Sequence, residues 1–258
     1  MKSSKIHEIT KTLMILKKLT ESSPYVKLLL KGFPSAGKTY KAAWFPQPVF
    51  LDFDGNIRGL NRIPDSIKKN ISILNPYIDD SGKEVTGMAW TKHFMSLVDQ
   101  LAACDDIKTI ILDSNTKMQE HLKIQLVGRS DPAAIDEKIK KDGFSFWGGY
   151  KNHMAFLLDY LLSHKVKKHV VVIQHVANKR DELTGSIRKE LVLEGGVADV
   201  VEQKFTDNWL AYTKTVGADT RYHVRTTGTE NFNAKCTFNL PQDFEFDKES
   251  DNIIKQLS

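Results

Sequence analysis

A glycine-rich segment with a lysine near its end constrains the fold of this chain more than any other feature. The apolar run Val26–Lys31 has the length of a strand, and it is followed by Gly32-Phe-Pro-Ser-Ala-Gly-Lys-Thr39 and by a helical pattern over Tyr40–Phe45. Glycines allow backbone torsions, and a close approach of a ligand to the backbone, that a Cβ would forbid. A strand, such a loop and a helix in this order predict a phosphate-binding site, because the loop and the helix N-terminus present N–H groups to an anion.

The two residues after the second glycine indicate the kind of ligand. Lys38 would place a full positive charge at the β- and γ-phosphates of a nucleoside triphosphate, and the Thr39 hydroxyl is suited to Mg²⁺. We therefore predict ATP and Mg²⁺ as cofactors. The nucleotide-binding residues expected from this segment are Gly32, Phe33, Pro34, Ser35, Ala36, Gly37, Lys38, Thr39 and Tyr40.

An aspartate follows a second buried strand. Asp113 comes directly after Thr109-Ile-Ile-Leu112, a run that would lie in the centre of a sheet. A carboxylate in that position lies at the carboxyl end of the strand, where α/β proteins bind their ligands, and it can hold the Mg²⁺ shell. The alternative is that Asp113 caps the next helix, because Asp and Ser are favoured at helix N-termini.

Strand-like and helix-like segments alternate over the first two-thirds of the chain, which predicts a mostly parallel sheet flanked by helices. The expected strands cover residues 26–31, 47–54, 71–74, 108–113 and 170–175. The expected helices cover residues 40–45, 90–103, 116 to about 128, and about 150 to 162. Further on, a hairpin turn at 182–187 and strands at 208–215, 222–227 and 235–239 predict an antiparallel extension at one edge of the sheet.

We expect one α/β domain overall. Residues 25–206 would form its core, and residues 207–258 a C-terminal β extension and tail packed on that core. Residues 1–24 would form an amphipathic helix, because apolar residues recur there at helical spacing. This helix would either pack on the sheet of its own domain or dock on a neighbouring subunit.

Composition excludes several classes of protein. The chain has 258 residues, of which 41% are hydrophobic and 27% charged, which is ordinary for a globular protein and argues against disorder. Two cysteines are too few for a disulfide framework, and no run approaches the roughly 18 apolar residues of a membrane span. The net charge of +5 permits a polyanionic partner without identifying one. We expect a cytoplasmic protein with no membrane partner.

The segment Phe50-Leu-Asp52-Phe-Asp54 resembles a strand of the RecA-like recombinase ATPases. In that family the strand after the phosphate-loop helix ends in an acid-x-acid pattern, and the second acid polarises the attacking water. The resemblance implies a RecA-like P-loop NTPase core and assigns the base position to Asp54, where the family usually has the longer glutamate. It also matches the family's γ-phosphate sensor to Gln174, next to His175. The alternatives are a solvated turn acid for Asp54 and a satisfied hydrogen bond at the strand end for Gln174 and His175.

More narrowly, residues 26–240 resemble the small phage-encoded RecA-like ATPases that are linked to single-strand annealing and recombination. The residues that carry this resemblance are His175, Asp181-Glu-Leu-Thr-Gly185, Phe205-Thr-Asp-Asn-Trp209 and Ala234-Lys-Cys-Thr237. The resemblance implies that Lys235 reaches the nucleotide of a neighbouring subunit, although Thr237 stands where a second basic residue is expected. It further implies single-stranded DNA as ligand, a homo-oligomer in the form of a filament or ring, and a phage single-strand-binding or annealing protein as a partner.

Basic residues after the fourth strand are candidates for DNA contacts. They are Lys179, Arg180, Arg188 and Lys189, and a second candidate region runs from Lys138 to Tyr150. Single-strand binders combine basic grooves with aromatic stacking platforms. Acidic residues interleave with both candidates, so on charge alone an ordinary solvated surface explains them equally well. A loop joined to the γ-phosphate through Gln174 and His175 would couple nucleotide state to ligand binding.

Three functions remain open at this stage. The first is a DNA-dependent ATPase that promotes annealing or strand exchange. The second is a small-molecule phosphotransferase, which needs arginines over the phosphates, and for which the sequence offers only Arg129, Arg180 and Arg188. The third is a nucleotide-dependent assembly module with little turnover, in which Asp54 has no catalytic part.

Overall fold

The computed structural model describes residues 24–128, 132–182 and 185–257. Apart from residue 24, the expected N-terminal helix lies outside this range, as does Arg129. Within the described residues, no helix combines the length and the apolar character needed to cross a bilayer.

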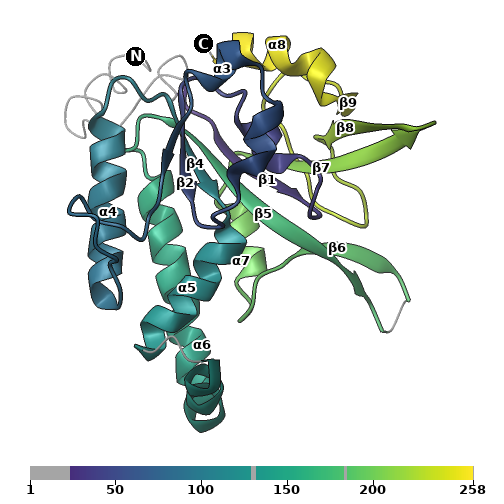
Figure 1. Cartoon of the computed structure of the whole chain (residues 1–258). Coiled ribbons are helices and arrows are strands. Elements are labelled where there is room, and N and C mark those ends of the chain that lie inside the picture. The colour runs from purple at the N-terminus through teal and green to yellow at the C-terminus, as the bar shows by residue number, and fades with distance from the viewer. Residues whose placement is uncertain (1–23, 129–131, 183–184, 258) are drawn as a thin grey trace, which may run out of the picture.

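A nine-stranded sheet forms the centre of the molecule (Figure 1). Its strands follow the order β3-β2-β4-β5-β1-β7-β8-β9, and β6 pairs with β5. All pairs from β3 to β7 are parallel, which confirms the predicted fold class. The strands are β1 (Lys27–Gly32), β2 (Pro48–Asp52), β3 (Ser72–Leu74), β4 (Thr109–Asp113), β5 (His169–Arg180), β6 (Ile187–Leu191), β7 (Asp207–Val216), β8 (Asp219–Arg225) and β9 (Asp243–Glu245).

Helices cover both faces of this sheet. They are α2 (Lys38–Ala42), the 3₁₀ helix η2 (Ile57–Arg62), α3 (Asp65–Lys68), α4 (Met88–Ala103), α5 (Asn115–Val127), α6 (Pro132–Leu162), α7 (Ala198–Gln203) and α8 (Phe246–Leu257). Side chains alternate between two cores along each central strand: Leu29 packs in the core with α4, α5 and α6, whereas Leu28 and Leu30 pack in the core with α2 and α8. A strand buried on both faces has the continuous apolar run seen in the sequence.

The C-terminal third differs from the prediction in two places. Residues 235–239 form no strand, since Lys235 makes only an isolated bridge to Asn208, and the third strand of the extension is β9. The chain then ends in a helix, α8, whose buried residues Phe246, Ser250, Ile253 and Leu257 recur at helical spacing. Because β7 pairs in parallel with β1, the extension continues the central sheet without interruption.

The helix before β5 is longer than expected. α6 begins at Pro132, and its chain bends at Asp142, where the backbone leaves helical torsions. Proline is favoured in the first turn of a helix because its missing N–H has no intrahelical partner there. Pro132 therefore begins a helix between residues 128 and 150, where the sequence predicted none.

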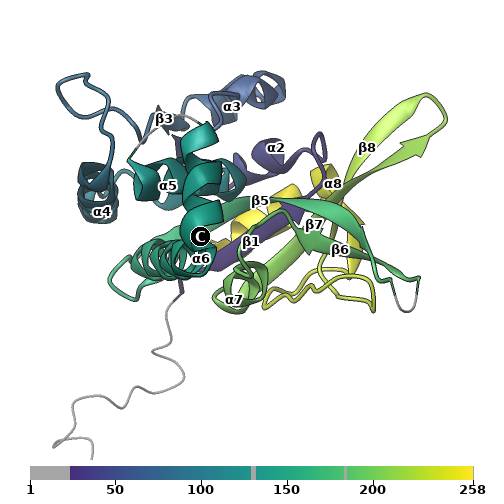
Figure 2. The ribbon, with the colours of Figure 1, turned by 90° about the horizontal axis from the view of Figure 1, so that it is seen from below.

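Two antiparallel hairpins extend beyond the body of the molecule on the same side (Figure 2). β5 runs out of the sheet into the first hairpin with β6, and β7 and β8 form the second. The hairpin turn predicted at residues 182–187 falls between β5 and β6, whose pairing ends at Arg180 and Ile187; residues 183 and 184 lie outside the described residues. Each hairpin begins in a strand that lies next to β1. Both hairpins are therefore joined through backbone hydrogen bonds to the strand that carries the glycine-rich loop.

Candidate functional site

The glycine-rich loop joins β1 to α2 and has the geometry that its sequence requires. Gly37, the residue before α2, has φ +71°, which is in the left-handed region that glycine adopts without strain. A Cβ at Gly32 would collide with the backbone carbonyl of Ala211 on β7, so the loop begins where two backbones approach closely. The buried Lys38 ammonium donates to the carbonyl oxygens of Gly32 and Phe33, at 3.0 and 2.8 Å.

Thr39 and Asp113 come together across two elements. The Thr39 hydroxyl donates to Oδ2 of Asp113 at 2.7 Å. Burial raises the pKa of Asp113 to about 7, and burial lowers the pKa of Lys38 to about 8. A hydroxyl and a carboxylate oxygen are hard ligands of the kind that Mg²⁺ prefers, so this pair fits the predicted metal. Ser114, and not Asp113, caps α5, because its hydroxyl accepts from the Lys117 amide.

The acid-x-acid strand places one acid in the site and one outside it. Asp54 lines the cavity, and its Oδ1 accepts a hydrogen bond of 2.9 Å from the Ser114 hydroxyl. Asp52 accepts from the Gly55 amide and lies outside the cavity lining, while Phe53 packs in the core between them. The Ser114 hydroxyl therefore holds Asp54 at the end of β4 next to Asp113.

A single cavity of about 510 Å³ joins these residues. It contains most of the predicted loop together with Asp54 and Asp113, which lie at or beyond the carboxyl ends of β2 and β4. It also contains His175, which lies within β5 and pairs with Gly32 at the carboxyl end of β1. Its lining residues are Pro34, Ser35, Gly37, Lys38, Thr39, Tyr40, Asp54, Asn56, Arg58, Gly59, Arg62, Asp113, Ile173, His175 and Tyr222. Gly32, Phe33 and Ala36 are absent from this lining; they carry the carbonyls that hold Lys38 and Lys41. The carboxyl ends of parallel strands are where α/β folds bind ligands.

Gln174 does not face the cavity, which corrects its predicted role as a catalytic sensor. Its side chain is fully buried, its oxygen accepts from the Asn115 amide at 2.8 Å, and its amide nitrogen donates to the Thr116 hydroxyl and to backbone carbonyls. The hydrogen bonds of the Gln174 side chain are thus satisfied within the protein, which was the alternative to a γ-phosphate sensor. Side chains alternate along a strand, so only one of two consecutive residues can point into the site.

His175 is the member of that pair that lines the cavity. Burial lowers the pKa of its imidazole, and the nearby Lys38 charge lowers it further. Its backbone amide donates to the Thr116 hydroxyl at 3.0 Å, which ties β5 to the start of α5. His175 therefore remains neutral near pH 7 and lies where the strand leaves the sheet to form the β5–β6 hairpin.

The remaining predicted residues lie outside this cavity. Lys235 lines a different cavity with Glu202 and Phe232. The four basic residues predicted to contact DNA are on the β5–β6 hairpin: Lys179, Arg180, Arg188 and Lys189. Lys179 forms an ion pair of 3.0 Å with Glu190, and the Lys189 ammonium lies 5.6 Å from the centre of the Phe232 ring.

Six of the cavity-lining residues named above were not predicted from the sequence, and three of them carry a guanidinium or phenol group. Arg58 and Arg62 on η2 line the cavity, as does Tyr222 on β8, and a Cβ built at Gly37 would lie 2.6 Å from the Tyr222 ring. A signal for the arginines was present, because they follow closely after Asp54. The sequence contains no signal for Tyr222, because this residue is more than 180 residues from the loop. It lies near the loop because β8 follows β7 and β1 in the sheet.

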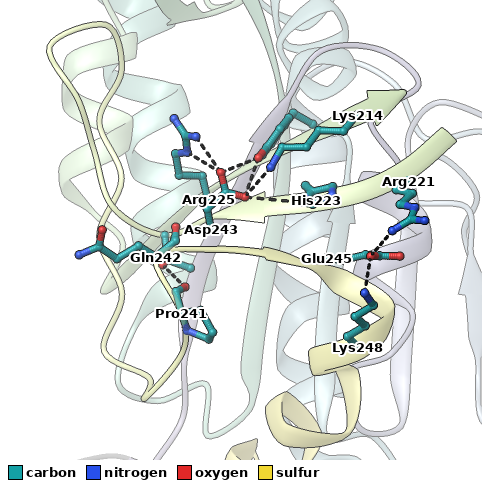
Figure 3. Close-up of polar contacts among 11 residues, drawn as sticks. Lys214, Arg221, His223, Arg225, Pro241, Gln242, Asp243, Glu245 and Lys248 are labelled. Atoms are coloured by element: carbon teal, nitrogen blue, oxygen red, sulfur yellow. Dashed lines mark hydrogen bonds and ion pairs between the residues drawn. The ribbon is translucent and has the colours of Figure 1, made fainter. Parts of the chain in front are cut away.

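The other face of β8 carries a network of charges (Figure 3). Arg225 donates to Asp243 at 2.7 Å, and Arg221 donates to Glu245 at 3.4 Å. Lys214 and His223 also approach Asp243, and Lys248 approaches Glu245. Successive side chains of a strand point to opposite faces, so Tyr222 faces the loop while its neighbours face this network.

One family of known proteins matches most of this chain. No curated protein matches the chain. Among solved structures, a KaiC-like protein of the hyperthermophilic archaeon Pyrococcus horikoshii OT3 is similar, with 14% identity, a TM-score of 0.40 and 78% of each chain covered. A family model described as the AAA domain matches residues 25–238, a range that runs from the start of β1 almost to β9 and includes the loop, both acids and His175. The chain therefore belongs to the AAA domain family, whose model covers most of its α/β core.

Proposed function

We propose that this protein hydrolyses ATP in a Mg²⁺-dependent reaction and acts on single-stranded DNA, promoting annealing or strand exchange in phage recombination. The observation that carries the ATPase part is the convergence of Lys38, Thr39, Asp54 and Asp113 on one cavity. The DNA part is supported by the basic hairpin that extends from the same cavity. The phage setting rests on the sequence resemblance described above.

Each of these cavity residues has a separate role in phosphoryl transfer. Lys38 neutralises phosphate charge, and Thr39 with Asp113 would hold Mg²⁺, which supplies further neutralisation when bound. Asp54 orients the attacking water, a role that needs position more than strong basicity because the transition state is loose. The Ser114 hydroxyl fixes the Asp54 carboxylate for this purpose.

The β5–β6 hairpin connects the nucleotide to DNA in this proposal. His175 lines the cavity, and the same strand continues without a break to Lys179 and Arg180. A change at the γ-phosphate would thus reach the basic residues through one strand. We further propose that the protein assembles on DNA as a homo-oligomer and works with a phage single-strand-binding or annealing protein.

The test measures ATP hydrolysis and oligomeric state with and without single-stranded DNA at low salt. We expect DNA to stimulate hydrolysis, and the combined Lys179, Arg180, Arg188 and Lys189 to alanine variant to lose that stimulation but keep its basal rate. The matched control replaces Lys165, Lys167 and Lys255 by alanine, because these exposed lysines lie outside both candidate regions. If hydrolysis and assembly of the wild-type protein ignore DNA, and no DNA binding is found, the DNA part of the proposal fails.

One observation favours a second candidate, a small-molecule phosphotransferase. That function needs arginines over the phosphates, and Arg58 and Arg62 line the cavity although the sequence suggested others. Transfer of labelled phosphate from ATP to a metabolite, at a rate above hydrolysis to water, would support this function. Release of all label as inorganic phosphate would leave the ATPase proposal standing.

A further inference from the structure

The 3₁₀ helix η2 is held against the glycine-rich loop. A Cβ built at Gly59 would lie 3.9 Å from Cβ of Thr39, so the helix passes over the residue expected to bind the metal. Leu60 and Ile63 anchor the helix and its end, since both are buried in the core that also contains α2. The backbone of η2 is therefore fixed relative to the phosphate-binding residues.

This placement brings two arginines to the cavity. Arg58 and Arg62 line it, and both side chains are exposed to solvent at its mouth. Lys38 is the other lysine or arginine in the lining, and it faces two carboxylates, Asp54 and Asp113. A bound triphosphate adds several negative charges to that end. Counting these residues alone, the two guanidinium groups change the lining from one basic group against two carboxylates to three basic groups against two.

Arg62 is held at the mouth by a neutral partner. Its Nη1 donates to the Tyr222 hydroxyl at 2.8 Å, and among the residues that the structure describes neither Arg62 nor Arg58 is ion-paired with a carboxylate. Tyr222 is itself packed against Gly37 and stacked on Tyr40, with 5.9 Å between the ring centres. A hydrogen bond to a phosphate oxygen is charge-assisted and about twice as strong as one to a neutral acceptor. An incoming phosphate therefore competes well for this guanidinium.

We propose that Arg62, assisted by Arg58, binds the phosphates of the nucleotide held at Lys38 of the same chain. The site thus carries its own arginines in cis, in addition to any residue that a neighbouring subunit supplies. Tyr222 orients Arg62 before the nucleotide arrives. In P-loop NTPases an arginine at the transferring phosphate stabilises the charge of the transition state. The inference deepens the proposed ATPase function and is independent of its DNA part.

The first experiment measures ATP affinity by titration calorimetry, without DNA and at protein concentrations below assembly. We expect Arg62→Ala and Arg58→Ala to weaken ATP binding about tenfold each, which corresponds to about 1.4 kcal/mol. Arg62→Lys should recover part of the loss, because it keeps the charge without the planar fork. The matched control is Arg221→Ala, an arginine next to Tyr222 whose side chain faces Glu245 instead.

The second experiment separates a cis from a trans role. Arg62→Ala is mixed with Lys38→Ala under assembling conditions, so that the second variant can offer an intact Arg62 but no working loop of its own. A cis arginine predicts that the mixture hydrolyses ATP no faster than the sum of its parts. Recovery above that sum would overturn the cis assignment.

Two further outcomes decide the inference. If Arg58→Ala and Arg62→Ala both match Arg221→Ala in ATP affinity and turnover, the arginines do not touch the nucleotide and the inference is wrong. If wild-type protein binds no nucleotide, the inference and the ATPase function fail together. Absence of stimulation by DNA, with the arginine effects intact, would remove only the DNA part of the proposed function.

Discussion

Two clusters of acids and bases lie in different parts of the molecule, one at the carboxyl ends of β2 and β4 and one on the C-terminal strands β8 and β9. The pKa values of their groups are shifted in opposite directions. At the cavity, burial moves each group toward its neutral form: the pKa of Asp113 rises to about 7 and the pKa of Lys38 falls to about 8. On the outer face of β8, partners keep the groups charged. Hydrogen bonding to Asp243 raises the pKa of Arg225, and hydrogen bonding from Lys248 lowers the pKa of Glu245.

These opposite pKa shifts indicate that the cavity cluster is a binding site and that the outer cluster is a structural network. Burial by itself would raise the pKa of Asp243, but hydrogen bonds from Tyr212 and Arg225 outweigh it and hold that pKa below the ordinary value. The negative charge of Asp243 is already stabilised by these partners, so binding of a further cation would add little stabilisation. Among the described residues, the Asp113 carboxylate accepts one hydrogen bond, from Thr39, and it lies beside a second acid, Asp54. Binding of a metal ion or a polyanion therefore changes the electrostatic energy of the cavity cluster more than that of the outer network. Groups with shifted pKa values in a cleft are typical of functional sites.

The strongest test of this contrast removes Lys38. We expect Lys38→Ala to weaken ATP binding by at least about a hundredfold, because its ammonium lines the cavity at the loop whereas the neighbouring Lys41 does not. Titration calorimetry measures the affinity, and Lys248→Ala in the outer network is the control. Near-normal affinity in Lys38→Ala would show that the cavity does not hold the phosphates at the loop.

The next test uses the raised pKa of Asp113. Since the folded-state pKa lies above the unfolded value near 3.8, the folded protein binds the extra proton, and the contribution of this group to stability falls as pH rises from about 4 to about 7. Asp113→Asn should remove that slope and be more stable than wild type at pH 8. Denaturation curves at several pH values measure this.

The same group should make metal binding depend on pH. The carboxylate must be ionised to bind Mg²⁺, so affinity for the Mg²⁺–ATP complex should increase up to about pH 7 and level off above it. Asp113→Asn should bind the complex weakly at every pH. An affinity of the wild type that does not change between pH 5 and pH 8 would contradict the role of Asp113 as metal ligand.

A smaller effect is expected in the outer network. Asp243→Ala should lower the free energy of unfolding by about 1–2 kcal/mol, because Arg225 and the Tyr212 hydroxyl lose their shared acceptor. The lowered pKa of Asp243 means that its contribution is present above pH 4 and is lost as pH falls through the folded-state value. ATP affinity should not change. A loss of ATP affinity comparable to that of the cavity variants would end the distinction between the two clusters.

The smallest effect belongs to Lys248. It pairs with Glu245 at 3.1 Å, and 69% of its side chain is exposed to solvent. Exposed pairs contribute little because water and salt screen them. We expect Lys248→Ala to leave both the melting temperature and ATP affinity within experimental error; a clear drop in melting temperature would show that the network is more cooperative than its pairs suggest.

The sequence by itself determined the parallel core and the loop. Strands such as Val170–Val172 are buried on both faces, so their apolar runs identify them without ambiguity, and the loop motif is local in sequence. The same locality correctly placed Asp113 and Asp54 next to Lys38, because the carboxyl ends of parallel strands meet at one edge of the sheet.

Only the tertiary structure decided the rest of the site. Sequence analysis selected Gln174, but the alternation of β5 turned it into the core and turned His175 into the cavity. Arg62 and Tyr222 belong to segments 160 residues apart, and the packing of η2 on the loop and of β8 beside β7 brings them into contact. Local patterns carry information about backbone conformation and burial, whereas the direction of one side chain depends on register and on contacts between segments distant in the chain.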